Sequence, residues 1–423
     1  MHPLQVGLIT GILMAMLATT VFAEQTLSLQ QSEQLALERD AVLKGQQHKV
    51  SALQDESVAA DAWPDPRLRF GFANLPTDSF ELDQEPMTQI ILGYQQALPR
   101  GDSNRLAAQL KATQAEAGKE DLSLRERQVR LGVRLAWYQV FLQDRSYQII
   151  EKNRQLYLQQ LDASESLYAA GKSQQQDVLQ AELELSLLDD RLQQVASMRE
   201  QSRAMLARWI SDEMAARPLT VSADQFKLAL NDTLASLTER LDQHPRVLKQ
   251  QRQIESSETQ VQMAEQKFSP QWSFDVSYGK RDGYNANGSD RPDFFSAMVN
   301  LDLPLFTADN QDRQLAASKS RLQAARYEHT DVKWSLAAEL KQIHARFGEL
   351  QQRLDLYRTR VLPQARDNAQ AAINGYQSGV VSFYALTRAR SAELKAELQY
   401  LKLQVEQAVA LAKIRFLIGE EKQ

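Results

Sequence analysis

The residue types that most often bind metal ions or carry out nucleophilic catalysis are sparse in this chain of 423 residues. There is no cysteine, which excludes disulfides, thiolate metal sites and thiol catalysis. The histidines are His2, His48, His244, His329 and His344, and no two of them form a His-x-x-x-His pair of the zinc-binding type. No Gly-x-x-x-x-Gly-Lys loop for the phosphates of ATP is present. The sequence therefore predicts a protein that is not an enzyme, with no cofactor and no metal site.

Two glycines interrupt long helical stretches at equivalent places. Tyr168-x-x-Gly171 lies within residues 100–217, which contain no proline and are rich in helix formers, and Tyr376-x-x-Gly379 lies in a similar stretch. Glycine can adopt the positive φ that lets a helix end and the chain reverse, so each stretch is predicted to be a hairpin of two long helices. Nearby apolar residues follow the alternating spacing of three and four that is typical of coiled coils. These apolar positions are Val178, Ala181, Leu185, Leu188, Leu192 and Val195 in one hairpin and Leu394, Leu398, Leu401, Val405, Ala408 and Ala412 in the other.

Four further stretches alternate apolar and polar residues, as β-strands do. They form two pairs, at about 67–97 and 271–303, and each pair ends in Leu-Pro. Each stretch is about 8–11 residues long, enough to cross a membrane within a barrel. Asp275, Ser277 and Asp302 lie at polar positions, where they would face a water-filled lumen and tune ion passage. A half-buried sheet of a soluble protein gives the same alternation, so the pattern leaves both alternatives open.

The order of helix, strand pair and helical hairpin occurs twice, which indicates an internal duplication of about 205 residues. Four strands are too few to enclose a water-filled barrel, and open strand edges cannot face lipid. If the strands span a membrane, several copies of the chain must contribute strands to one barrel.

The first residues have the pattern of a secretory signal peptide. An apolar run over residues 6–18 precedes Val21-Phe22-Ala23, which places a cleavage site before Glu24. The run is short for a membrane span, so cleavage is favoured over an uncleaved anchor. The predicted divisions are a signal peptide at 1–23, a first repeat at 24–215 with its hairpin at about 103–212, and an equatorial segment plus second repeat at 216–423 with its hairpin at about 311–418.

Together, the duplicated strand pairs, the duplicated hairpins, the Tyr-x-x-Gly corners and the signal peptide resemble the TolC-type outer-membrane efflux proteins. The resemblance covers roughly Leu27 to Glu420. It implies a mainly α-helical homotrimer, in which the helical hairpins form a coiled-coil tunnel across the periplasm. Each copy would contribute four strands to a transmembrane β-barrel of twelve strands. The stretches Asp65–Gln89 and Leu98–Arg105 are similar to the branch associated with heavy-metal and cation efflux.

On this resemblance the protein is a passive channel in the outer membrane of a Gram-negative bacterium, and it exports substrates, expected to be metal cations. The implied partners are a periplasmic adaptor, an inner-membrane pump of the RND type and outer-membrane lipid. Nucleic acid is not an expected partner, since the formal net charge is −5 and there is no lysine excess. The alternatives are a multidrug or type I secretion channel, or an exported coiled-coil adaptor or structural protein.

The resemblance places a gate and the adaptor contact at the two helix corners, which would be the periplasmic tips of the tunnel. The positions that carry over are Tyr168, Gly171, Asp177, Tyr376 and Gly379. Tyrosine and aspartate near these corners join links between helices in the family, although Asp177 also suits an ordinary exposed carboxylate at a helix start. Val381 stands where a basic residue is common, and Ala385 and Arg388 stand where acidic rings occur, so those features are not expected here.

Pro363 interrupts the helical stretch that leads to the second corner. Proline lacks the backbone N–H and its ring clashes with the preceding turn, so we expect a helix bend there. Such a bend would suit a hairpin that curves inward to close a tunnel.

Overall fold

The computed structural model describes residues 26–221, 226, 230 and 232–419, so the predicted signal peptide lies outside the described residues. The first half of the chain comprises α1 (Leu29–Arg39), α2 (Ala41–Asp61), β1 (Arg67–Ala73), β2 (Gln89–Ala97), α3 (Ser103–Ala169), α4 (Gln175–Ile210) and α5 (Asp212–Ala215). The second half comprises α6 (Leu234–Glu239), a 3-10 turn η1 (Arg240–Gln243), α7 (Pro245–Gln266), β3 (Gln271–Lys280), β4 (Phe294–Asp302), α8 (Gln311–Leu356), a π-helical turn η2 (Tyr357–Val361), α9 (Leu362–Gln377) and α10 (Phe383–Ile418).

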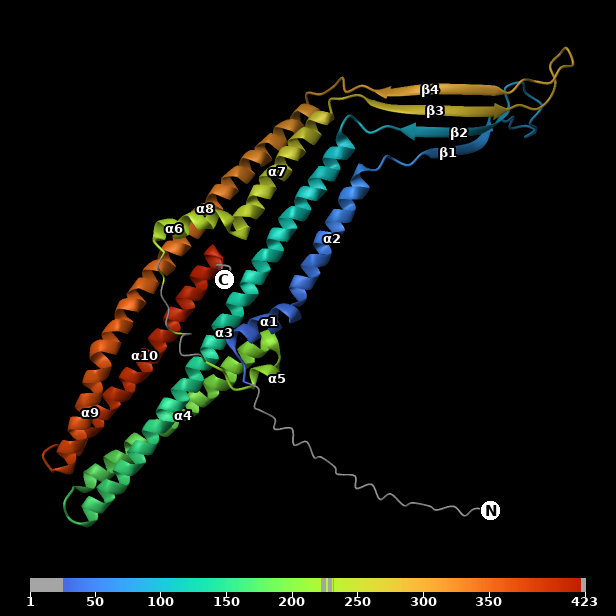
Figure 1. The fold of residues 1–423 in the computed structure, drawn as a ribbon. Coiled ribbons are helices and arrows are strands. Elements are labelled where there is room, and N and C mark those ends of the chain that lie inside the picture. Colours follow the sequence, from blue (N-terminus) through green and yellow to red (C-terminus); the bar gives the residue numbers. More distant parts are fainter. Residues whose placement is uncertain (1–25, 222–225, 227–229, 231, 420–423) are drawn as a thin grey trace, which may run out of the picture.

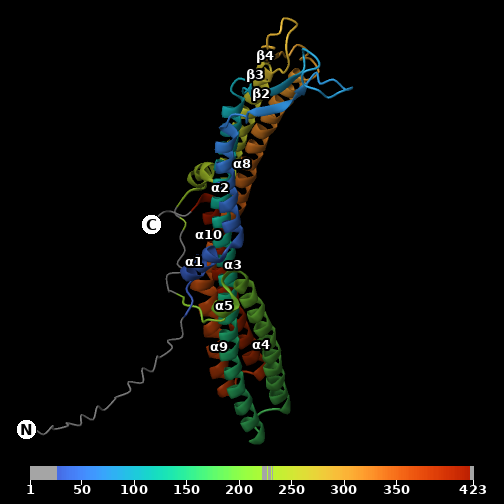
Figure 2. The ribbon, with the colours of Figure 1, turned by 90° about the vertical axis from the view of Figure 1, so that its right-hand side faces the viewer.

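The molecule is elongated, with a β-sheet at one end and two helix corners at the other (Figure 1). Helices α3 and α4 form one hairpin, and the α8–α9 helix with α10 forms the second. The view turned by 90° shows how narrow the resulting bundle is (Figure 2). The coiled-coil positions predicted in α4 and α10 are all buried or half-buried, because these helices pack along their apolar seams.

All four strands form one antiparallel sheet in the order β1-β2-β3-β4. Each repeat supplies one β-hairpin, and pairing of β2 with β3 joins the two hairpins into one sheet. Within the described chain β1 and β4 are therefore edge strands, each with one side of its backbone unpaired.

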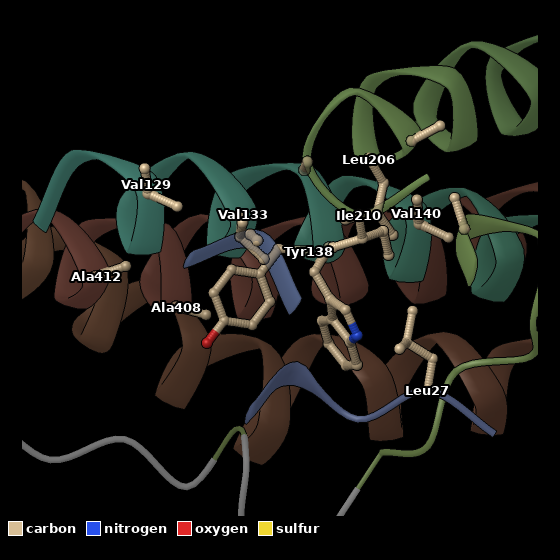
Figure 3. Packing of buried hydrophobic residues seen from close by; sticks show 14 of the residues in the cluster. Leu27, Val129, Val133, Tyr138, Val140, Leu206, Ile210, Ala408 and Ala412 are labelled. Atoms are coloured by element: carbon tan, nitrogen blue, oxygen red, sulfur yellow. The ribbon is translucent and has the colours of Figure 1, made fainter. Parts of the chain in front are cut away.

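The largest apolar cluster lies at mid-length, where α1, α3, α4, α5 and α10 meet (Figure 3). Trp137 of α3 is fully buried there and stacks on Phe141 with ring centroids 6.0 Å apart. Leu219 and Phe226, from the segment predicted to be equatorial, pack against the same cluster, and Leu219 forms a parallel bridge with Leu27. Leu27, near the first described residue, and Leu219 and Phe226, from the link between the repeats, are thus all anchored at the middle of α3.

Ion pairs also fix the first two helices to α3. Asp40 caps α2 by accepting a hydrogen bond from the N–H of Leu43 at 2.7 Å, and it pairs with Arg125 of α3 at 2.7 Å. The Arg125 guanidinium lowers the pKa of the Asp40 carboxyl below its usual value. Glu33 of α1 binds Arg134 of α3 at 2.5 Å. These contacts hold the helices that lead into β1 against the long α3 rod.

The helix that contains Pro363 runs without a loop from α8 through η2 into α9, and Pro363 is the second residue of α9. The π-helical turn lies directly before α9, at Tyr357–Val361. A wider turn of this kind changes the hydrogen-bond register of the helix, which accommodates a residue that has no N–H. The helix is thus irregular one turn before Pro363, on the way to the second corner.

His244 caps α7 from a fully buried position. Its Nδ1 accepts a hydrogen bond from the N–H of Arg246 at 3.1 Å, and its ring contacts Phe416 edge-on at 5.7 Å between centroids. Burial, followed by the nearby charges of Arg127 and Arg246, lowers the pKa of His244 to about 4. The imidazole is therefore neutral in the folded protein at neutral pH.

We expect acid to destabilise the fold through this histidine. An unfolded histidine takes up a proton near pH 6.5, whereas His244 in the folded chain does so only near pH 4, so the unfolded state binds more protons in between. The free energy of unfolding should fall by up to about 3 kcal/mol as the pH drops through this window. Thermal unfolding of the detergent-solubilised protein, followed by circular dichroism at several pH values, measures the loss. His244→Asn keeps a capping acceptor without the titrating ring, and an unchanged pH slope in this variant would contradict the assignment.

Candidate functional site

Both helix corners end in the same hydrogen-bonded motif around a glycine with positive φ. The φ angles are +68° at Gly171 and +75° at Gly379, as the sequence predicts. At the first corner the N–H of Gly171 donates to the carbonyl of Tyr168 at 2.9 Å, and the N–H of Lys172 donates to the carbonyl of Leu167 at 2.8 Å. The second corner repeats this pattern from Gly379 to Tyr376 at 3.0 Å and from Val380 to Gly375 at 2.9 Å. This is the Schellman motif, in which glycine is needed for the left-handed conformation, while the tyrosine contributes only its carbonyl.

Near the corners the two hairpins pack against each other. Phe383, at the start of α10, is almost fully buried in a cluster that includes residues of α3, α4 and α9. Tyr376 packs edge-on against Phe383, with ring centroids 5.5 Å apart, and its hydroxyl lies 3.3 Å from Oγ of Ser164 on α3. Further up, the hydroxyl of Tyr157 donates to the backbone carbonyl of Thr387 at 3.3 Å. Two tyrosine hydroxyls thus link the first hairpin to the second.

The other predicted tip residues are not part of these links. Asp177 is half-buried in the first turn of α4, and Tyr168 is 48 % exposed. Within the part of the chain that the structure describes, neither side chain forms an ion pair or a hydrogen bond. The structure therefore brings Tyr376 to the other hairpin and leaves the side chains of Asp177 and Tyr168 without a partner among the described residues.

One face of the sheet is apolar and uncovered. The register places Phe70, Leu92, Tyr278 and Phe295 side by side across the four strands. Their exposed fractions are 75, 57, 49 and 73 %. A soluble sheet would bury such a row against a second layer, whereas a membrane barrel turns it toward lipid.

The opposite face is polar and carries an ion pair that spans three strands. Arg69 of β1 reaches across β2 to bind Asp275 of β3, and Asp275 is only 3 % exposed. The Arg69 side chain passes over Gly93, where an added Cβ would lie 3.4 Å from Nε of Arg69. Ser277 and the exposed Asp302 lie on the same face, as predicted. The charge of Asp275 is compensated, however, so it does not contribute a free carboxylate.

Arg69 was not singled out from the sequence. Its position among the polar residues of β1 is visible in the alternation, but the pattern does not identify Asp275, 206 residues away, as its partner. Among the described residues there is no group of three or more histidine, cysteine, aspartate or glutamate side chains suited to hold a metal ion. Within the same residues, no helix combines the length and the apolar character needed to cross a membrane.

Paired helical hairpins, joined to a short sheet whose uncovered face is apolar, define the subunit of an outer-membrane channel. The chain belongs to the outer membrane efflux protein family, whose model matches residues 33–210 and 237–420. This confirms the family, the mainly helical fold class and the non-enzymatic role expected from the sequence.

Solved structures share this fold. CusC, described in terms of folding and transmembrane channel formation, has a TM-score of 0.76 at 16 % identity, covering 93 % of this chain and 92 % of its own. The outer membrane protein VceC of Vibrio cholerae has a TM-score of 0.75 at 15 % identity, and the match covers 93 % of this chain and 97 % of VceC. The open state of the MtrE outer membrane channel of Neisseria gonorrhoeae has a TM-score of 0.74 at 15 % identity, and the match covers 92 % of this chain and 88 % of MtrE. Among curated proteins, no sequence matches the chain significantly.

Proposed function

We propose that three copies of the chain form the outer-membrane channel of a tripartite efflux system. The observation that supports this proposal most directly is the four-stranded sheet, which is apolar on one face, polar on the other and open at both edge strands. Lipid does not tolerate unpaired backbone groups, so the edges of β1 and β4 need partners before the apolar face can enter a membrane. Copies of the same chain supply such partners, and four strands from each of three copies give a barrel wide enough for a water-filled lumen.

The helices also carry apolar side chains that a single chain leaves uncovered. On α4, Leu179, Leu183 and Leu187 are spaced four apart and are 56, 53 and 55 % exposed. On α8, Tyr327 and Trp334 are 75 and 71 % exposed. Rows of this kind mark surfaces that pack against another protein. Neighbouring copies in a trimeric helical tunnel would cover them.

The tips are the proposed gate and the proposed contact with a periplasmic adaptor. Val380 and Tyr384 are 83 and 67 % exposed at the second tip. A groove of about 710 Å³ runs between α9 and α10 beside them, and Val381, Tyr384 and Arg388 are among its lining residues. A groove lined mainly by alanine side chains, with Arg388 also in its lining, suits a helix of an adaptor.

Metal cations, delivered by an inner-membrane pump of the RND type, are the proposed substrates. This choice is supported by the similarity of Asp65–Gln89 and Leu98–Arg105 to the heavy-metal and cation efflux branch. In a host that lacks its own outer-membrane efflux channel, the protein with its cognate adaptor and pump should restore growth in elevated metal salts. Restored tolerance to organic toxic compounds, without metal tolerance, would favour the multidrug alternative instead.

The assembly itself has a direct test. We expect the protein to fractionate with the outer membrane and to migrate in SDS as a trimer that becomes a monomer only on heating. In planar bilayers the purified trimer should form channels. A monomer that stays soluble in the periplasm without detergent would contradict the proposed function.

A further inference from the structure

The two edge strands carry complementary charges at the same end of the sheet. Arg67 is the first residue of β1, and Asp302 is the last residue of β4. Both therefore lie where the sheet meets the helices, since β1 follows α2 and β4 precedes α8 (Figure 1). Both side chains are exposed.

The register places both side chains on the polar face. Arg67 is opposite Gln95, Gln95 is opposite Asp275, and Asp275 is opposite Met298, so these four residues share one face. Asp302 follows Met298 by four positions on the same strand and therefore lies on that face too. Both charges would thus face the water-filled lumen of a barrel, not the lipid.

Neither charge has a partner within the part of the chain that the structure describes. The arginine two residues further along β1, Arg69, is already bound to the buried Asp275. Asp302 forms neither an ion pair nor a side-chain hydrogen bond, and Arg67 likewise forms none. The sheet thus presents, at one open edge, a cation and, at the other, an anion, and neither is paired with another described residue.

We propose that Arg67 of one copy forms an ion pair with Asp302 of the next copy across the seam between β1 and β4. This inference rests on the proposed trimer. Strand β1 runs away from the helices and β4 returns toward them, so β1 of one copy and β4 of the next would pair in antiparallel orientation with their helix-proximal ends together. Opposite charges on neighbouring strands stabilise a pair and oppose other registers. The ion pair would therefore fix the register of each seam, three times per trimer.

Charge reversal at the seam tests the proposal. Purified trimers are held in SDS at one temperature, and the half-life of the trimer band is measured. Arg67→Asp and Asp302→Arg should each shorten this half-life by about tenfold or more, because three weak ion pairs are replaced by three repulsive contacts. The double variant Arg67→Asp with Asp302→Arg should restore most of the half-life. Ser277→Asp is the control, since it adds an acidic side chain to the same polar face but on the central strand β3, away from either edge, and it should have little effect.

Proximity can be measured separately because the natural chain has no cysteine. A variant with both Arg67→Cys and Asp302→Cys, treated with a short bis-maleimide, should give a covalent trimer that survives boiling. Each single cysteine variant should remain monomeric after boiling. If neither charge reversal shortens the half-life of the trimer, or if the double variant does not restore it, the ion pair is wrong, although the proposed trimer is not contradicted. Absence of any wild-type trimer would overturn the proposed function and this inference together.

Discussion

Val299→Arg is expected to prevent assembly of the protein in the outer membrane. Val299 lies near the middle of β4 on the apolar face, opposite Phe274, and it is 57 % exposed because no described part of the chain covers it. An arginine facing lipid near the middle of a barrel strand costs about 2–4 kcal/mol per copy, and a trimer would carry three. The amount of heat-modifiable trimer in the outer-membrane fraction measures the effect, which should approach complete loss.

The next residue provides a matched control. Asn300 lies on the polar face, where its side chain is exposed and donates to Oγ of Ser273 at 3.4 Å. Asn300→Arg adds the same side chain one position away on the same strand, but toward water, so assembly should be retained. Equal losses from both variants would mean that the apolar face does not contact lipid and that the barrel proposal is wrong.

The sequence predicted those features that depend on local physics. Alternation in the strands gives the two faces of the sheet, because successive side chains point to opposite sides. Coiled-coil spacing in α4 and α10 gives the buried seams. The reversals at Gly171 and Gly379 follow from the positive φ that glycine adopts at little cost. In each case the pattern is complete within a few residues.

Features that depend on distant partners were not predictable in this way. Alternation places Arg69 and Asp275 on the polar face, but only the strand register brings them together across Gly93. His244 has no sequence signal for burial, since the residues that cover it, such as Phe416, come from the other end of the repeat. Tyr376 and Asp177 were predicted together from the resemblance, and among the described residues only the side chain of Tyr376 has a partner, Ser164. Sequence patterns thus locate the candidate site but do not identify its contacts.

Tyr376→Phe is expected to shift the proposed gate toward its open form. The substitution keeps the ring against Phe383 and removes only the hydroxyl that lies 3.3 Å from Oγ of Ser164. A hydrogen bond of this kind contributes about 1 kcal/mol, so three copies that open together would gain roughly 100-fold in the ratio of open to closed forms. Single-channel recordings in planar bilayers should show a higher mean conductance.

A double-mutant comparison separates the hydrogen bond from general loosening of the tip. Ser164→Ala should raise the conductance as Tyr376→Phe does, and the two together should do no more than either alone, because both remove the same bond. Tyr327→Phe on α8, away from the tips, keeps the ring that a neighbouring copy would cover and removes only a hydroxyl, so it should leave the conductance unchanged. We also expect Asp177→Ala to raise the conductance, and since Asp177 has no partner within the described chain, that result would locate its partner on a neighbouring copy or on the adaptor. If the single-channel conductance is unchanged in all of these tip variants, the gate lies elsewhere in the tunnel.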